Sequence, residues 1–281
     1  MSWSIVADSS VNMYHLDDLP AGVSFTTVPL KIRCGEREFV DNAALNTKEM
    51  MELLDNYNGP SGSACPSPEE WAEKFLAADN SIAVTISSQL SGSYNSACIA
   101  AKMVMEEHPE KRIHVVDSLS VGAEMTFIVE RAIELIHQGA SFDLIAYELD
   151  HLKDHVGLQF VLCSFENLVK NGRMSRISGL VAGVLGIRAV GRASTEGKID
   201  MFGKARGETK ALALILEEMD RSGFKGGKVY IDHVHNPQAA HMLARAITAK
   251  WPSAQIQVRM CGGLCSFYAQ DQGLILGYML A

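Results

Sequence analysis

The chain has 281 residues, 47% of them hydrophobic and 21% charged, a length that allows one large domain or two modest ones. Its formal net charge of −8 argues against binding to nucleic acid and against attachment to an anionic membrane surface. The first residues, MSWSIVADSS, lack the features of a secretory signal, and the apolar stretch 177–190 is too short to span a membrane. We therefore expect a cytoplasmic protein without stable membrane insertion.

The cysteines and histidines do not form a recognisable metal site. Six cysteines are scattered along the chain, and Cys261 and Cys265 have no second Cys or His pair at zinc-ligand spacing. His233 and His235 would lie on one face of a strand, but the sequence indicates no further carboxylate or histidine that would complete a metal site with them. We expect no bound metal ion and no other cofactor.

Ser or Asp-Ser directly follows each of three early apolar runs, residues 4–7, 82–86 and 113–116. Such runs, separated by helices, are typical of a parallel α/β sheet. Helices are predicted at 94–107, 121–137 and 142–153. The segments FTTVPLKIR and REFVD flank Cys34-Gly35-Glu36 and predict a hairpin.

The order of elements changes near residue 156, where strand–helix alternation gives way to a mixed order. Strands are predicted at 156–164, on both sides of the Glu196-Gly197 turn, and at 228–236, 254–261 and 273–280. Helices are predicted at 165–172, 177–186, 208–223 and 237–251. The chain is thus expected to be an α/β protein of two domains: 1–156 with a parallel sheet, and 157–281 with a mixed α/β fold.

The loop ISSQLSGSYNSA, residues 86–97, lies between a predicted strand and a predicted helix. In open α/β sheets this is the edge where ligands bind. Free amides at a helix start and the Ser91 hydroxyl could hold an anion, or Ser91 and Ser93 could serve only as helix caps. The loop has no Lys, which favours a carboxylate over a polyphosphate.

A second group of hydroxyls lies in SGSACPSPEEW, residues 61–71. Ser67 as N-cap and Pro68 in the first turn predict a helix over 69–77. Ser63 precedes this helix and is expected in a loop.

Several motifs occur together in one order: ADSS, VPLKI, SACPS, ISSQLSGSYNSA, VVDS, NLVKNGRMS and GKARG. With them the chain resembles the DegV family over almost its whole length. The resemblance implies two α/β domains with a lipid tunnel between them that holds a long-chain fatty acid, such as palmitate or stearate. It also implies a non-catalytic binding subunit, which presents the acyl carboxylate to a separate fatty acid kinase that makes acyl phosphate.

The resemblance also assigns roles to individual residues. Ser63 and Ser91, with the Gly92 amide, are expected to bind the carboxylate. Arg173 and Arg206 are expected near the head-group, the transferred phosphate or the kinase. A histidine of the family is replaced by Tyr268, and its Gly-Pro-Gly by Gln270-Asp271-Gln272. Tyr268 can still donate a hydrogen bond but cannot become cationic, so fatty-acid binding should survive this change better than kinase coupling.

Two other functions are compatible with these residues. The first is a small-molecule hydrolase or transferase that uses Ser91 or Cys65, although no base is evident for either nucleophile. The second is a phosphocarrier or sugar-binding module that uses His233 or His235. Glycines at 179, 183 and 186 could leave room for an acyl chain beside a helix, or only allow close helix packing.

Overall fold

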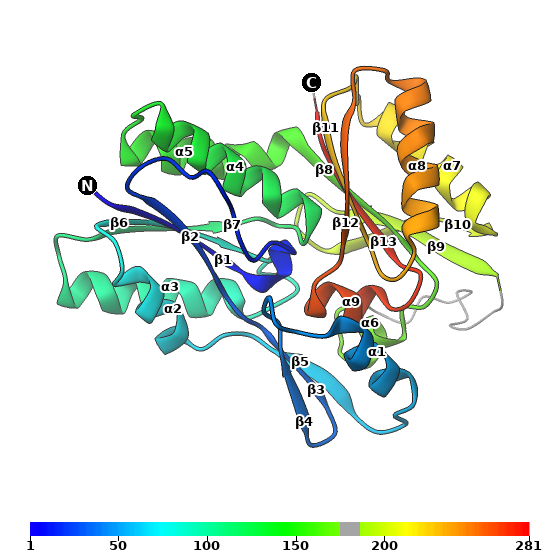
Figure 1. Ribbon diagram of the computed structural model, residues 1–281, viewed down its shortest axis with the longest axis horizontal. Coiled ribbons are helices and arrows are strands. Elements are labelled where there is room, and N and C mark those ends of the chain that lie inside the picture. Colours follow the sequence, from blue (N-terminus) through cyan, green and yellow to red (C-terminus); the bar gives the residue numbers. More distant parts are fainter. Residues whose placement is uncertain (175–185, 281) are drawn as a thin grey trace.

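The computed structural model describes residues 1–174 and 186–280, and within them the strands form three sheets (Figure 1). The first sheet is parallel and has the order β2-β1-β6-β7. Its strands are β1 (Trp3–Asp8), β2 (Val23–Val28), β6 (Asn80–Thr85) and β7 (Arg112–Asp117). The predicted N-terminal parallel sheet is confirmed.

Helices cover both faces of this sheet, and its inner strands β1 and β6 are buried on both sides. Ile5 and Ala7 belong to a core formed with α4 (Ala123–His137) and α5 (Phe142–Leu152). Val6 points the other way, toward α2 (Pro68–Phe75) and α3 (Ser93–Glu107). Because both faces of β1 meet apolar side chains, this strand is a nearly continuous apolar run. The helices predicted in this part of the chain are confirmed within two residues at each end.

The segment FTTVPLKIR, predicted as one arm of the hairpin, is divided between two strands, of which only the second belongs to the hairpin. Pro29 has no N–H to donate and separates β2 from β3 (Lys31–Cys34). The chain then enters a small antiparallel sheet with β4 (Arg37–Val40) and β5 (Ser61–Ala64), and the predicted hairpin is confirmed. Ser63 therefore lies in β5, paired with Ile32, and not in a loop. The sequence analysis also missed α1 (Thr47–Asp55).

The third sheet is mixed and has the order β10-β9-β8-β13-β11-β12. Only β11 and β12 run parallel. The strands are β8 (Val156–Leu162), β9 (Ile187–Ala193), β10 (Ile199–Arg206), β11 (Lys228–His233), β12 (Gln255–Met260) and β13 (Leu274–Met279). The predicted mixed α/β fold of the C-terminal part is confirmed.

Helices α7 (Glu208–Arg221) and α8 (Pro237–Lys250) pack on one face of the mixed sheet. The other face meets α4, α6 (Glu166–Lys170) and α9 (Gly263–Ala269), of which α9 was not predicted. The helix predicted at 177–186 lies outside the described residues, apart from its last residue, Gly186, which is in a turn. Single-turn 3-10 helices, η1 (Ser9–Val11) and η2 (Lys153–His155), complete the elements.

Helix α4 lies between the parallel sheet and the mixed sheet and packs on both. Nine of its side chains are buried, from Ala123 near its start to Leu135 near its end. Gly277 on β13 allows the closest approach, because a Cβ there would lie 2.8 Å from the backbone of Ala123 and Glu124. The two sheets are therefore held in a fixed relation by one shared helix.

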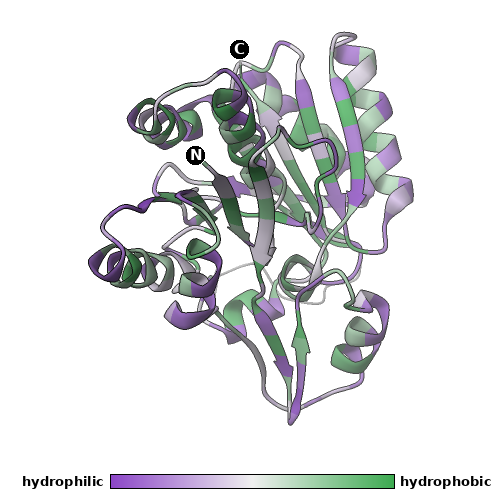
Figure 2. Ribbon diagram, turned by 60° about the vertical axis from the view of Figure 1, so that its left-hand side comes forward, coloured by the Kyte–Doolittle hydropathy of each residue, from purple (hydrophilic) through white to green (hydrophobic). Residues whose placement is uncertain are grey.

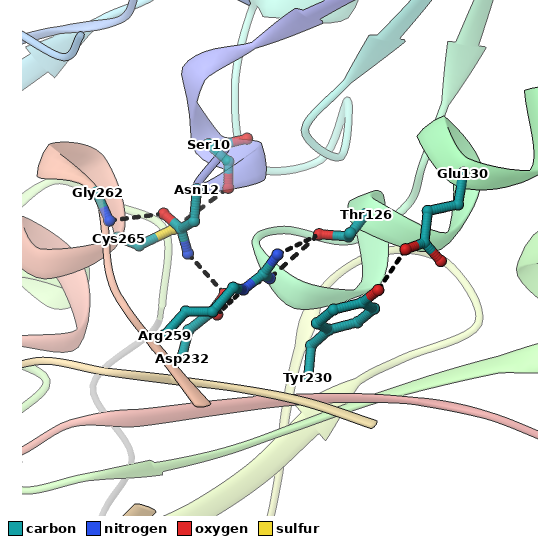
Figure 3. A network of polar contacts seen from close by, with 9 residues as sticks. All are labelled: Ser10, Asn12, Thr126, Glu130, Tyr230, Asp232, Arg259, Gly262 and Cys265. Carbon is teal, nitrogen blue, oxygen red and sulfur yellow. Dashed lines mark hydrogen bonds and ion pairs between the residues drawn. The ribbon is translucent and has the colours of Figure 1, made fainter. Parts of the chain in front are cut away.

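A buried polar network also ties the two parts of the chain together (Figure 3). Asn12 donates to Asp232 Oδ2 (2.9 Å) and accepts from the Gly262 N–H (2.9 Å). Arg259 donates to Asp232 Oδ1 (2.8 Å) and to Thr126 Oγ1 (3.1 Å). Asp232 is fully buried, so loss of a partner would leave a buried charge unpaired.

Hydropathy follows this arrangement. Figure 2 shows hydrophobic residues along the central strands, while the helices outside them also carry hydrophilic residues. Within residues 1–174 and 186–280, none of the helices has the length and apolar content needed to cross a membrane.

Candidate functional site

A cavity lies between the carboxyl edge of the parallel sheet and one face of the mixed sheet. It encloses about 830 Å³ of space free of protein atoms, part of it open to solvent. Ile86, just after β6, and Val121, in the connection from β7 to α4, line it from one side. Phe160 and Ile275 line it from the other side. The carboxyl edge of the sheet, predicted as the ligand edge, thus forms one wall.

The walls of the cavity are mostly aliphatic. Alternate residues of β8, namely Leu158, Phe160 and Leu162, point into it, while Val161 packs on the opposite face of the sheet. The other apolar lining residues are Leu30, Ile86, Leu90, Leu119, Val121, Leu168, Ala193, Ile199, Leu264, Cys265, Ala269 and Ile275. Such a surface suits a hydrocarbon ligand.

Ser63 and Tyr268 meet in the wall of this cavity. Ser63 Oγ and the Tyr268 hydroxyl are 2.8 Å apart, and either atom can be the donor. Ser63 comes from β5 and Tyr268 from α9, elements far apart in sequence, and both side chains are half-buried. The two hydroxyls can therefore share their protons with a ligand that carries acceptor oxygens.

Ser91 lines the same cavity, in a loop that the strand ends hold in place. Asp8, at the end of β1, accepts hydrogen bonds from Ile86 N (2.8 Å) and Ser93 Oγ (2.7 Å). Ser91 Oγ accepts a hydrogen bond from Ser93 N (3.3 Å) at the start of α3, and Ser91 also lines the cavity. The N-cap position of α3 is Gly92, so neither Ser91 nor Ser93 is the N-cap residue. Gly92 lines an adjoining surface hollow but not the cavity itself.

The two predicted arginines differ in their surroundings. Arg173, just after α6, lines the cavity and donates to the carbonyl oxygens of Leu90 (3.1 Å) and Asn171 (2.6 Å). Its guanidinium carbon lies 5.9 Å from the centre of the Tyr268 ring. Arg206, at the end of β10, is exposed and does not line the cavity.

Arg173 is suited to pair with an anionic ligand. The cavity is also lined by Arg192 and Lys198, but Arg192 is paired with Asp200 and Glu218, and Lys198 with Glu196. The hydrogen bonds of Arg173 all go to carbonyl groups, so its positive charge is not balanced by an acid among the described residues. Arginine binds a carboxylate in a planar, bidentate fashion.

The turn between β9 and β10 closes one side of the cavity. Ser87 Oγ donates to the Gly197 carbonyl (2.7 Å), which joins the serine loop to this turn. Gly197 has a φ of +80°, and a Cβ there would lie 2.4 Å from Ser87 Oγ. Only glycine fits this close contact.

The alternative sites find little support in the described residues. Ser91 has no histidine or carboxylate partner that could act as its base, and Cys65 is exposed with no described hydrogen bond. His235 does not share a strand with His233, because β11 ends at His233 and His235 has a φ of +49°. Burial lowers the pKa of His233, and no group of three His, Cys, Asp or Glu side chains in the described part is placed to hold a metal ion.

Comparison with known proteins gives the family. A family model described as "Uncharacterised protein, DegV family" matches residues 2–275. The chain belongs to the DegV family. A DegV domain-containing protein of Streptococcus gordonii is 43% identical to it over 278 residues, which are 99% of each chain. The predicted DegV resemblance is confirmed.

Two solved structures of DegV type are closely similar. The Streptococcus pneumoniae Fatty Acid Kinase (Fak) B3 protein, loaded with linoleic acid, has a TM-score of 0.97 at 39% identity. A DegV family protein from Eubacterium eligens, loaded with heptadecanoic acid, has a TM-score of 0.95 at 36% identity. In both comparisons the match covers 100% of each chain.

The sequence analysis missed most of the cavity wall in this DegV protein. Leu158, Phe160 and Leu162 were predicted only as part of a strand, and the period of two along β8 would have placed them on one face. The other face carries Gly157, Gln159 and Val161. Which of the two faces lines a cavity could not be read from the strand, because the strand does not show what packs against each face.

Proposed function

We propose that this protein binds one long-chain fatty acid in the cavity, with the carboxylate at Ser63, Tyr268 and Ser91. One observation carries the proposal: a mostly aliphatic cavity has two facing hydroxyls and an arginine in its wall. The linoleic and heptadecanoic acids in the two similar structures support the same chemical class.

The geometry explains how a carboxylate could be held without a metal ion. The Ser63 and Tyr268 hydroxyls bond to each other, so one of them can turn its proton toward the ligand while the other donates to its neighbour. Arg173 supplies positive charge nearby and stays fixed by carbonyl acceptors. Two or three such donors stabilise a carboxylate that is partly removed from water. The Gly92 amide, at the start of α3, is the predicted further donor.

We further propose that the bound carboxylate is presented to a separate fatty acid kinase and that the protein is not itself the catalyst. The name of the Streptococcus pneumoniae relative supports a kinase partner. An open hollow adjoins the cavity at Ser91 and Arg173, where a partner could reach the ligand from outside. Arg206 is exposed and stays a candidate contact for the kinase. A cytoplasmic location and a division into domains at residue 156 belong to the same proposal.

A displacement assay tests fatty-acid binding. Protein stripped of lipid is loaded with a fluorescent polyene fatty acid, and hexadecanoic acid or hexadecanol is added. We expect hexadecanoic acid to displace the probe much better than hexadecanol, because only the acid carries a negative charge that Arg173 and the Ser63 and Tyr268 hydroxyls can stabilise. Equal displacement by both would show that the polar wall does not bind the carboxylate.

The kinase step has its own test. The loaded protein is incubated with ATP and a bacterial fatty acid kinase catalytic subunit, and acyl phosphate is trapped with hydroxylamine. We expect acyl hydroxamate only when kinase and loaded protein are both present. Hydroxamate formed by the loaded protein and ATP alone would contradict a purely binding role.

A further inference from the structure

A second hollow adjoins the cavity beyond Leu158. It is lined by Val156 and Gly157 of β8 and shares Leu119, Leu158, Arg192 and Ala193 with the first cavity. It encloses about 910 Å³ of space free of protein atoms, part of it open to solvent. The strand β8 therefore runs along both hollows, with Leu162 and Phe160 in the first and Gly157 and Val156 in the second.

The second hollow is far more polar than the first. Its wall includes hydroxyl groups and charged side chains from several elements: Ser118, Lys153, Asp154, Arg192, Ser194, Thr195, Ser222 and Tyr278. Hydrocarbon alone would be a poor match for such a surface, because polar groups lose their hydrogen bonds when apolar groups cover them.

A serine and a glutamate stand at the junction of the two hollows. Ser120 lines the first hollow, Glu124 lines the second, and the Ser120 hydroxyl donates to Glu124 Oε2. Glu124 lies in the first turn of α4 and is only 5% exposed. No described residue donates a hydrogen bond to its other oxygen, and burial raises the pKa of Glu124 to about 7.

Solvent can reach the second Glu124 oxygen from the second hollow, because this oxygen is not fully enclosed. Covering it with an apolar chain end would cost free energy unless a donor on the ligand replaces the water. The donor would have to come from the second hollow, since Ser120 already serves the oxygen on the other side. A saturated chain end has no such donor, whereas a hydroxyl group on the chain can donate to the carboxyl group and accept from a neighbour.

We propose that the second hollow receives the far end of the acyl chain and that Glu124 recognises a hydroxyl group there. The preferred ligand is then a long-chain fatty acid with a hydroxyl at or near its methyl end. This inference rests on the proposed function, because the chain must first be fixed by its carboxylate in the first cavity.

The test compares two pairs of ligands: hexadecanoic and octadecanoic acids, and their ω-hydroxy counterparts. Dissociation constants are measured by displacement for the wild type, Glu124→Leu and Glu124→Gln. A hydrogen bond to a charged group corresponds to a factor of about ten or more in affinity. We expect Glu124→Leu to weaken binding of at least one hydroxy acid by about that factor and to leave the plain acids unchanged or tighter.

Glu124→Gln keeps an acceptor oxygen and should retain part of the preference. Glu134→Leu, on the same helix but lining neither hollow, is the matched control and should bind all four acids as the wild type does. Thermal unfolding of each variant shows that it is folded.

The inference is overturned if Glu124→Leu changes the plain and hydroxy acids by the same factor. It is also overturned if each hydroxy acid binds more weakly than its plain counterpart and the ratio of the two affinities is the same in the wild type and in Glu124→Leu. If the wild type binds none of the four acids, the proposed function itself fails, and this result is distinct from the other two.

Discussion

Replacement of Tyr268 by Phe removes one of the three hydroxyls proposed to bind the carboxylate and keeps the ring in place. The Tyr268 hydroxyl lies 2.8 Å from Ser63 Oγ, so in the ligand-free protein the variant loses one neutral hydrogen bond at a half-buried position. In the complex with a fatty acid, the variant loses one of the hydrogen-bond donors that act on the charged carboxylate. A hydrogen bond to a charged group contributes about 1.5–3 kcal/mol, which corresponds to a loss of roughly 10-fold to 150-fold in affinity.

The assay is calorimetric titration of lipid-free protein with hexadecanoic acid and with its methyl ester. The ester has no charge, so its affinity should fall by less than the affinity of the acid, about tenfold at most. Tyr147→Phe, on α5 and 60% exposed, is the matched control and should bind both ligands normally. If Tyr268→Phe binds the acid as tightly as the wild type, or loses acid and ester by the same factor, the assignment of Tyr268 to the carboxylate is wrong.

Three further predictions test other parts of the structure. Leu158→Trp should block the cavity where it joins the second hollow. Each excluded methylene forfeits about 0.8 kcal/mol, so displacement assays should show weaker binding of hexadecanoic acid but unchanged binding of decanoic acid, with Leu144→Trp on the surface as control. Asp232→Ala should lower the free energy of unfolding in urea by about 3–5 kcal/mol, because it leaves Arg259 without its buried partner, while Asp220→Ala at an exposed ion pair should cost at most about 1 kcal/mol. Burial raises the pKa of Glu124 from 4.5 to about 7, so the folded chain holds this proton more tightly than the unfolded chain. The stabilisation from this proton is fully present below about pH 4.5, and the free energy of unfolding should fall by about 3 kcal/mol as the pH rises through 7. Glu124→Gln should make the free energy of unfolding depend less on pH. The Leu158 prediction is contradicted if the variant loses affinity for hexadecanoic and decanoic acid by the same factor. The Asp232 prediction is contradicted if both Asp→Ala variants lower the free energy of unfolding equally. The Glu124 prediction is contradicted if wild type and Glu124→Gln show the same dependence of stability on pH.

Much of the fold could be predicted because the local patterns agree with the tertiary structure. The apolar runs before Asp8 and Asp117 became parallel strands, β1 inside the sheet and β7 at its edge. The strand β1 needs no polar alternation because it is buried on both faces. Those two carboxylates cap loop amides, as in the bonds from Ser88 and Leu119 to Asp117. The errors lie where short elements depend on distant partners: β5 exists only because β3 pairs with it, and α9 begins where buried Asp41 accepts hydrogen bonds from Gly263 N and Leu264 N.

For the candidate site, too, some residues could be named from the sequence, whereas their arrangement could not. Ser63, Ser91, Arg173 and Tyr268 were named from the family resemblance, and the structure brings all four to one cavity wall although they span more than 200 residues of sequence. Local sequence patterns cannot predict that these residues lie close together, because their proximity depends on how the mixed sheet and the parallel sheet pack around α4. The Ser120–Glu124 pair could not be found from the sequence for a similar reason, since an acid in a first helical turn is normally exposed.

The most direct test of the account is mass spectrometry of the protein as purified under native conditions from bacterial cells. The account predicts one long-chain fatty acid per chain, released as the free acid on denaturation. Protein without acyl chains that also fails to take up added hexadecanoic acid would contradict it.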